Sequence, residues 1–297
     1  MDFQELVQQI INGLALGSTY ALLALGLAML FSIMGLINFA HGELLTIGGY
    51  TMWVLIDHGV PFAAVVPLTL LATTLAAVGM ERIAFRPLRG ASIVTLLITS
   101  FAVSVLIRNA FSIGVAPDPR SVPAPAWLSQ VVDIGPFTVP RLQLVTTGAT
   151  LVALALLLVF LRRTLLGVSM RAAAEDFQVV RLMGVNADRV IVAAFALSGL
   201  LAGIAAILLV SQATAVDPDT GTVPIVKAFI AVVIGGLSSL SGAVAGGFAL
   251  GFLEVILQAT LPEDVRPFRD AFALLILVAL LFFRPQGLVG PRQEART

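Results

Sequence analysis

The chain has 297 residues, of which 59% are hydrophobic and only 11% charged, and its formal net charge is +0. Soluble domains carry about 25% charged residues, so this composition, with a mean hydropathy of +1.03, excludes an ordinary soluble fold. The balanced charge also excludes nucleic acid as a natural partner. Because the chain has no cysteine and two histidines, His41 and His58, we expect no disulfide, no metal site and no cofactor.

Apolar stretches recur from one end of the chain to the other, so we expect residues 1–297 to form a single all-α domain, a polytopic membrane helix bundle. The stretches lie at 7–30, 41–56, 61–80, 92–106, 142–161, 190–210, 223–240, 243–261 and 271–283. A full crossing needs about 20 apolar residues, so the shorter stretches predict broken or half helices. We expect eight or nine membrane segments, and seven full crossings if two short segments only dip into the membrane.

The distribution of basic residues predicts the orientation of the spans. The acidic start of the chain lacks the basic region of a signal peptide, so we expect the first span to be retained. Most basic residues fall on one side of the predicted spans, namely Arg82, Arg86, Arg89, Arg162, Arg163, Arg171, Arg181, Arg189, Arg284, Arg292 and Arg296. By the positive-inside rule this side is cytoplasmic, which places the N-terminus outside, the C-terminus inside and the proline-rich loop at about 115–141 outside.

Two glycine-rich stretches, 35–43 and 235–242, interrupt apolar sequence. Each is a candidate helix break at membrane depth, where the freed backbone groups must be buried in protein or line a wet cavity. Matched breaks in two halves of a chain are typical of inverted repeats around a transport site. The alternative is two tight turns between ordinary spans.

A polar segment at 167–189 separates two long apolar stretches and predicts an amphipathic helix of roughly 15 residues. Its apolar positions are Met170, Ala173, Phe177, Val180 and Gly184, while Arg171, Glu175 and Gln178 share another face. Gly184 predicts a helix end, and Asn186 with Asp188 predicts the next N-cap. We interpret the segment as a coupling helix through which a separate ATPase acts, with Arg171, Glu175, Asp176 and Gly184 as its coupling residues. The alternative is a solvated loop helix.

Motifs for catalysis are missing from the chain. A phosphate-binding loop needs a lysine followed by serine or threonine, but Lys227 is the only lysine and Ala228 follows it. Neither histidine lies in the sequence context of a serine hydrolase. We therefore expect that the chain is not an enzyme and that any ATPase is another subunit.

Polar residues within predicted spans are candidates for the translocation path or for helix breaks, because a charge at the membrane centre costs on the order of 3 kcal/mol. They are Ser18, Thr19, Asn38, His41, Glu43, Lys227 and Glu254. Each also has a structural alternative. Ser18 and Thr19 suit close helix packing, His41 and Glu43 could cap a broken helix, Lys227 could extend to the interface, and Glu254 with Gln258 could form an interhelical hydrogen bond.

Several of these motifs together resemble the branched-chain amino acid ABC importer permeases, specifically the shorter permease subunit type. They are LGSTYAL at 16–22, GLINFAHGE at 35–43, the polar segment at 171–188, and the pairs KA at 227–228 and GG at 235–236. The resemblance covers nearly the whole chain. It implies a bacterial inner-membrane permease that pairs with a second related permease or a copy of itself, with two cytoplasmic ATP-binding subunits and with a periplasmic solute-binding protein.

We expect the chain to carry a small amino acid by alternating access driven by the separate ATPases. Two alternatives stay open at this point. The same architecture could carry urea or short amides, or the chain could be a self-sufficient ion-coupled carrier or channel with Glu43, Lys227 and Glu254 as a charge relay.

Overall fold

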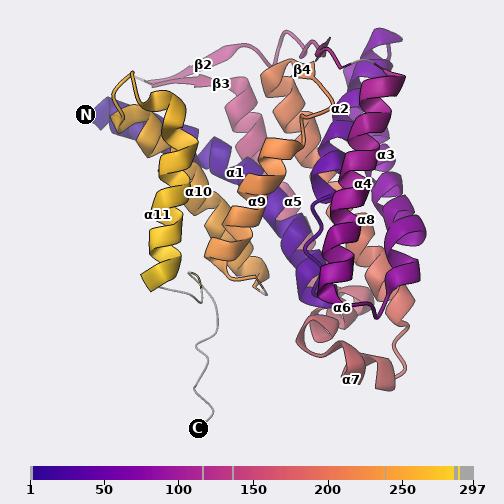
Figure 1. Ribbon diagram of the computed structural model, residues 1–297. Helices are drawn as coiled ribbons and strands as arrows, with labels where there is room; N and C mark the ends of the chain where they lie inside the picture. The colour runs from indigo at the N-terminus through magenta and orange to yellow at the C-terminus, as the bar shows by residue number, and fades with distance from the viewer. Residues whose placement is uncertain (1–2, 116, 136, 238, 284–286, 288–297) are drawn as a thin grey trace.

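The computed structural model (Figure 1) describes residues 3–283, except 116, 136 and 238, together with residue 287. The basic residues Arg284, Arg292 and Arg296, used above for orientation, lie outside this part of the chain. The described part is an almost entirely helical bundle. Six of its helices are long and apolar enough to cross a membrane, which makes the chain a multi-pass membrane protein. They are α1 (Phe3–Met34), α3 (Phe62–Met80) with the short turns that follow it, α4 (Ile93–Gly114), α5 (Arg141–Arg163), α8 (Ala187–Ala213) and α10 (Leu240–Thr260).

Shorter elements complete the bundle. The remaining helices are α2 (His41–Asp57), α6 (Leu165–Glu175), α7 (Phe177–Leu182), α9 (Thr222–Gly235) and α11 (Arg269–Phe283), with the short helical turns η1 (Glu81–Phe85), η2 (Arg86–Leu88) and η3 (Arg266–Phe268). Four short strands, β1 (Arg120–Ser121), β2 (Val131–Ile134), β3 (Phe137–Pro140) and β4 (Ala215–Val216), form the pairs β1–β4 and β2–β3, both antiparallel. They gather at the end of the bundle opposite α6 and α7 (Figure 1). The expected fold was purely helical, and these strands are its exception.

Two central helices organise the packing. α1 and α8 are the most buried of the six long helices, whereas α3, α4 and α5 expose much of their apolar surface. α1 packs along α10, and α8 packs along α3 in the same way. The short helices follow the same correspondence, because α9 contacts α10 and α1 while α2 contacts α3 and α8.

The first chain break lies inside the bundle. α1 ends at Met34, residues 35–40 are not helical, and α2 starts at His41. The His41 side chain is fully buried, and its Nδ1 lies 3.0 Å from Ser198 Oγ in the middle of α8. Two hydrogen bonds connect the non-helical segment to α4, from the Phe39 amide to Ser100 Oγ and from Ser100 Oγ to the Ile37 carbonyl, both at 3.3 Å. The freed backbone is therefore satisfied by protein, as a break within a membrane requires.

The second break lies at 214–221, between α8 and α9. Gly221 packs against Gly42 at the start of α2, and the Gly221 amide donates to Thr46 Oγ1 at 3.2 Å. The two short helices α2 and α9 therefore begin at the same place in the bundle. The predicted break at 235–242 takes the form of its alternative, a turn between ordinary helices, because α9 ends at Gly235 and α10 begins at Leu240. Ser239 is the N-cap of α10, and its Oγ accepts from the Gly242 amide at 3.0 Å.

The contact between Gly42 and Gly221 gives a first testable prediction. A Cβ at Gly221 would lie 1.9 Å from the Gly42 carbonyl oxygen, so Gly221→Ala must separate the starts of α2 and α9. We expect a loss of about 1–3 kcal/mol in the free energy of unfolding, which titration of the purified protein in mixed micelles would measure. Gly148→Ala in α5 is the matched control, because a Cβ there meets nothing within 4 Å. Equal stability of both variants would contradict the close packing.

The bounds of α4 differ from the expected stretch 92–106. The helix continues to Gly114, through Arg108 and Asn109. The apolar pattern stops at Arg108, but this side chain is accommodated by ion pairs with Glu43 and Asp219. A hydropathy pattern cannot detect such a partner from a distant part of the chain.

Candidate functional site

A cluster of polar side chains joins α1, α9, α10 and α11 within the bundle. Lys227 Nζ donates to Glu254 Oε2 at 2.9 Å, to Tyr20 OH at 3.1 Å and to Asp270 Oδ1 at 3.3 Å. Tyr20 OH in turn donates to Glu254 Oε2 at 2.9 Å. The Glu254 side chain is 2% exposed and that of Lys227 is 12% exposed, so this is a buried ion pair with a hydrogen-bonded tyrosine.

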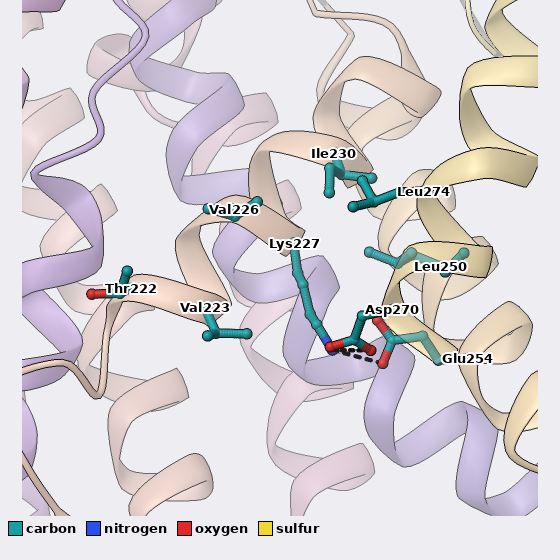
Figure 2. Close-up of a pocket in the computed structure, with 10 residues that line it drawn as sticks. Thr222, Val223, Val226, Lys227, Ile230, Leu250, Glu254, Asp270 and Leu274 are labelled. Atoms are coloured by element: carbon teal, nitrogen blue, oxygen red, sulfur yellow. Dashed lines mark hydrogen bonds and ion pairs between the residues drawn. The ribbon is translucent and has the colours of Figure 1, made fainter. Parts of the chain in front are cut away.

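The cluster lies beside a cavity of about 200 Å³ between α9, α10 and α11. Figure 2 shows Lys227 extending from α9 toward the adjacent carboxylates of Glu254 and Asp270, with apolar side chains such as Val223, Ile230 and Leu274 around the remaining wall. The Lys227 side chain is 12% exposed and ends on carboxylates of α10 and α11. Its charge is neutralised inside the protein, as expected for an ionisable residue among membrane-spanning helices.

Glu254 makes interhelical hydrogen bonds, but its neighbour Gln258 has a separate partner. Gln258 Oε1 accepts from the Arg269 guanidinium at 2.9 Å, and Arg269 Nε also donates to Asp270 Oδ1 at 3.2 Å. The start of α11 is thereby held to α10 by one continuous chain of polar contacts.

A second polar cluster surrounds the start of α2. Glu43 is 2% exposed, and its Oε1 accepts from Ser104 Oγ at 2.7 Å and lies 3.7 Å from the Arg108 guanidinium. Arg108 also pairs with Asp219 at 3.2 Å. These contacts join α2, α4 and the second break. Glu43 thus has different partners from Lys227 and Glu254.

Aromatic rings lie beside this second cluster. Phe39, in the first break, stacks on Phe101 of α4 at 4.4 Å between ring centroids and contacts Phe229 of α9 at 5.5 Å. Asn38 next to it is buried. Aromatic pairs of this kind add about 0.5–1.5 kcal/mol beyond area burial, so Phe39 helps to fix the first break between α4 and α9.

Ser18 and Thr19 lie on the part of α1 that packs against neighbouring helices. Both side chains are buried and bond to carbonyls of their own helix, Ser18 Oγ to Leu14 at 2.6 Å and Thr19 Oγ1 to Ala15 at 3.3 Å. The neighbouring Gly17 packs against the backbone of Phe248 in α10. This is the packing alternative, and small residues allow the close approach of α1 and α10.

The polar segment at 167–189 forms two helices rather than the single rod expected. α6 ends at Glu175, and the extended backbone of Asp176 separates it from α7. Asp176 Oδ1 accepts from the Val179 amide at 3.0 Å, which caps α7 and explains the bend, because a capping aspartate satisfies the free amides of a new helix. The predicted end at Gly184, where φ is +80°, and the N-cap at Asn186 are both present.

The two faces of this segment differ in part as the pattern predicted. Met170, Ala173 and Val180 are buried, whereas Arg171 and Glu175 are exposed. Of the other positions expected on the apolar face, Phe177 is half-buried and Gly184 is exposed. Arg171 Nε donates to the Leu161 carbonyl at 3.0 Å, so this residue ties α6 to the end of α5. The largest exposed apolar side chains here are on and after α7, with Leu182 87% and Met183 79% exposed. These two residues and Val179 form what we call the α7 tip, which projects from the bundle (Figure 1).

Ion pairs connect the polar segment to the rest of the bundle. Asp188, in the first turn of α8, pairs with the Arg89 guanidinium and lies 3.5 Å from that of Arg86. Arg89 also pairs with Glu81, which is fully buried at the end of α3. A displacement of α7 and the start of α8 would therefore act on α3 through Arg89.

Sequence reasoning missed several of the residues in these clusters. Tyr20 lies in the motif at 16–22 but was not among the candidate site residues, and nothing in the local pattern distinguishes Ser104 or Ser198. Arg108, Asp219 and Asp270 fall outside the predicted apolar stretches. Arg108 could have been found, because it is an arginine followed by asparagine in apolar surroundings, and a charge there requires a partner.

The described part of the chain thus combines interrupted helices with buried charges. The family model described as branched-chain amino acid transport system / permease component matches residues 9–283. The chain belongs to this permease family. It is 33% identical over 97% of both chains to the high-affinity branched-chain amino acid transport system permease protein BraD of Pseudomonas aeruginosa. It is 32% identical, again over 97% of both chains, to the permease protein LivH of Escherichia coli.

A more distant similarity extends to archaea. The permease is 29% identical over 91% of its length to a probable branched-chain amino acid transport permease protein LivH of Methanocaldococcus jannaschii. No solved structure matches the permease significantly. The family consists of transport components rather than enzymes, and it confirms the resemblance drawn from the motifs at 16–22, 35–43 and 171–188.

Proposed function

We propose that the chain is the membrane-spanning subunit of an ATP-driven importer for branched-chain or other hydrophobic amino acids. The observation that carries this proposal is the full-length similarity to BraD and LivH, whose names specify that cargo. An amino acid with an apolar side chain needs a path with apolar walls and few polar anchors. The two buried charge clusters among apolar spans have this character.

We propose that ATP is hydrolysed by two separate cytoplasmic subunits, since the chain has no phosphate-binding loop. In this proposal these subunits act on the segment at 167–189, where Glu175 and Asp176 are exposed and Gly184 permits the chain to reverse. The α7 tip gives the ATPase an apolar surface, and Arg171 transmits its movement to α5. A second related permease or a copy of this chain and a periplasmic solute-binding protein complete the complex.

The membrane topology that we propose has nine segments, with α2 and α9 as the two half helices. The end of the bundle bearing α6 and α7 is cytoplasmic, so the N-terminus is outside and the C-terminus inside the bacterial inner membrane. The basic residues near α6 and α7 support this orientation. The matching contacts of α1 with α10 and of α8 with α3 support an inverted repeat of α1–α4 and α8–α11.

Within this topology the cargo passes close to the starts of α2 and α9. Asn38, His41 and Glu43 form one wall of the region, and Lys227 with Glu254 forms the other charge cluster. The supporting feature is that interrupted helices occur in transporters at the substrate site, where irregular backbone lines a cavity. Ser18 and Thr19 have a packing role, and Glu43 is held by Ser104 and Arg108.

Reconstitution tests the proposal against a self-sufficient carrier. The chain, a second permease, the ATPase subunits and the binding protein are placed in vesicles, and uptake of labelled leucine is measured with and without ATP. We expect uptake only with the complete set and ATP. Uptake by the chain alone, independent of ATP, would contradict the proposal and favour a carrier with Glu43, Lys227 and Glu254 as relay.

The same vesicles test whether the cargo is an amino acid or another small solute. Urea and a short amide such as acetamide are tested beside leucine at equal concentration with the same binding protein. We expect leucine to be taken up and the two amides to be excluded. Preferential uptake of urea would leave the importer architecture intact but overturn the proposed cargo.

A further inference from the structure

A second, larger cavity lies at the end of the bundle that carries α6. Its volume is about 560 Å³, and it is formed by the end of α1, the end of α5, α6 and the start of α10. The buried part of its lining is apolar and includes Leu25, Met29 and Leu157, and Leu158 and Val244 also line it. It is separate from the two buried charge clusters, although Arg171 and Glu175 of the proposed coupling segment contribute to its lining. We call it the α5–α10 groove.

The helix packing explains why the groove exists. α5 and α10 both pack against α1 but make little contact with each other, and the cavity lies between them beside the buried side chains of Leu25 and Met29. Leu158, on the wall contributed by α5, is 54% exposed. α5 is a peripheral helix that exposes much of its apolar surface, as expected of a helix that contacts lipid.

The mouth of the groove is polar and carries excess positive charge. Arg162 and Arg171 line it together with Glu175 and the hydroxyl groups of Ser239 and Ser241. The Arg171 guanidinium uses Nε for the Leu161 carbonyl, which fixes its position at the mouth. Two arginines against one glutamate give a local excess of one positive charge, and the serine hydroxyls add donors.

We propose that the α5–α10 groove binds an anionic phospholipid. The phosphate contacts Arg162 and Arg171 at the mouth, and an acyl chain lies on Leu158 and Val244. Basic pockets between membrane helices recognise anionic headgroups. The buried part of this groove is apolar, so it can hold an acyl chain but offers no contact to a soluble anion. Because Met170 and Glu175 of α6 also line the groove, the bound lipid contacts the segment proposed for coupling. The inference depends on the chain being a membrane protein and not on its cargo.

Lipid titration followed by native mass spectrometry tests the proposal. The purified full chain in detergent is titrated with phosphatidylglycerol and, separately, with phosphatidylcholine of the same acyl chains. We expect tight binding of one phosphatidylglycerol. We expect Arg162→Gln to weaken that binding about fivefold, because one basic side chain near an anionic lipid surface raises the affinity by about this factor. Arg163→Gln is the matched control, since Arg163 is the exposed neighbour that does not line the groove.

A larger side chain in the groove tests whether an acyl chain binds there. Leu158→Trp is expected to displace phosphatidylglycerol, while Leu156→Trp, on the same helix, exposed and outside the groove, leaves its binding unchanged. Millimolar inorganic phosphate and glycerol phosphate should not compete. Full competition by these soluble anions would show an anion site without a lipid, which overturns the proposal.

Two further results would also overturn it. One is equal binding of phosphatidylglycerol by the wild type and the Arg162→Gln/Arg171→Gln variant. The other is loss of the bound lipid when the chain assembles with its partner permease, which would show that the groove is a protein interface.

Discussion

Lys227→Met is expected to destabilise the protein by about 3–5 kcal/mol, because it leaves the buried Glu254 carboxylate with Tyr20 alone. Glu254 is 2% exposed, so water cannot replace the lost ammonium. The free energy of unfolding in mixed micelles measures the effect. The loss should exceed that of Asp270→Asn, since the side chain of Asp270 is about half exposed. A loss below 1 kcal/mol would show that the ion pair is not structurally important.

The double variant Lys227→Met/Glu254→Leu separates a structural role of this pair from a role in transport. Removing both charges of a buried pair is often neutral or stabilising, so we expect most of the lost stability to return. Leucine uptake in vesicles is then compared with that of the wild type. A stable variant with normal uptake would assign the pair to folding alone. A stable variant without uptake would support its place in the translocation path.

Leu182→Asp should abolish ATP-driven uptake while the free energy of unfolding stays unchanged. The Leu182 side chain is 87% exposed on the α7 tip, so it contributes little to the stability of the isolated chain. In the proposed complex the Leu182 side chain is buried against the ATPase. Loss of a central apolar contact in an interface lowers the free energy of binding by about 2 kcal/mol or more. Co-purification of the ATPase subunits with the chain measures this interaction directly, and at least a tenfold loss is expected.

Val131→Asp is the matched control for this experiment. Val131 is 55% exposed on β2, at the opposite end of the bundle (Figure 1), so the same chemical change should leave ATPase binding intact. If Leu182→Asp retains the ATPase subunits and drives uptake at the wild-type rate, the α7 tip is not the docking surface. A lower stability of Leu182→Asp would instead indicate an internal packing role that its exposure does not suggest.

The sequence predicted the elements whose signal is local. The apolar stretches gave α2, α3 and α5 almost to the residue, because hydrophobic length is a property of consecutive positions. The faces of the polar segment were correct in part, since Met170 and Ala173 are buried but Gly184 is exposed. The bend at Asp176 was missed, since the same apolar spacing fits one helix or two and only the capping contact to Val179 decides between them.

The candidate site was predicted in part. Lys227 and Glu254 were identified because a charge within an apolar stretch is conspicuous. Their contacts with Tyr20 could not be predicted, because they require α1 to meet α9 and α10, and Tyr20 lies more than 200 residues from both Lys227 and Glu254 in sequence. The second break, at 214–221, lies between the predicted stretches 190–210 and 223–240, and no break was predicted there. The aspartates and proline at 217–219 are typical of both environments, and only the contact of Gly221 with Gly42 reveals that the chain turns inward.

The sequence by itself determined that this is a helical membrane permease with a charged segment between spans. Composition and consecutive apolar residues carry that information, because each span must bury its backbone polar groups within its own helix. Tertiary structure alone decided which interruption lies inside the bundle, which charges neutralise one another and where a groove remains between helices. These features depend on contacts between side chains of spans that are distant in sequence, and a local sequence pattern contains no information about such contacts.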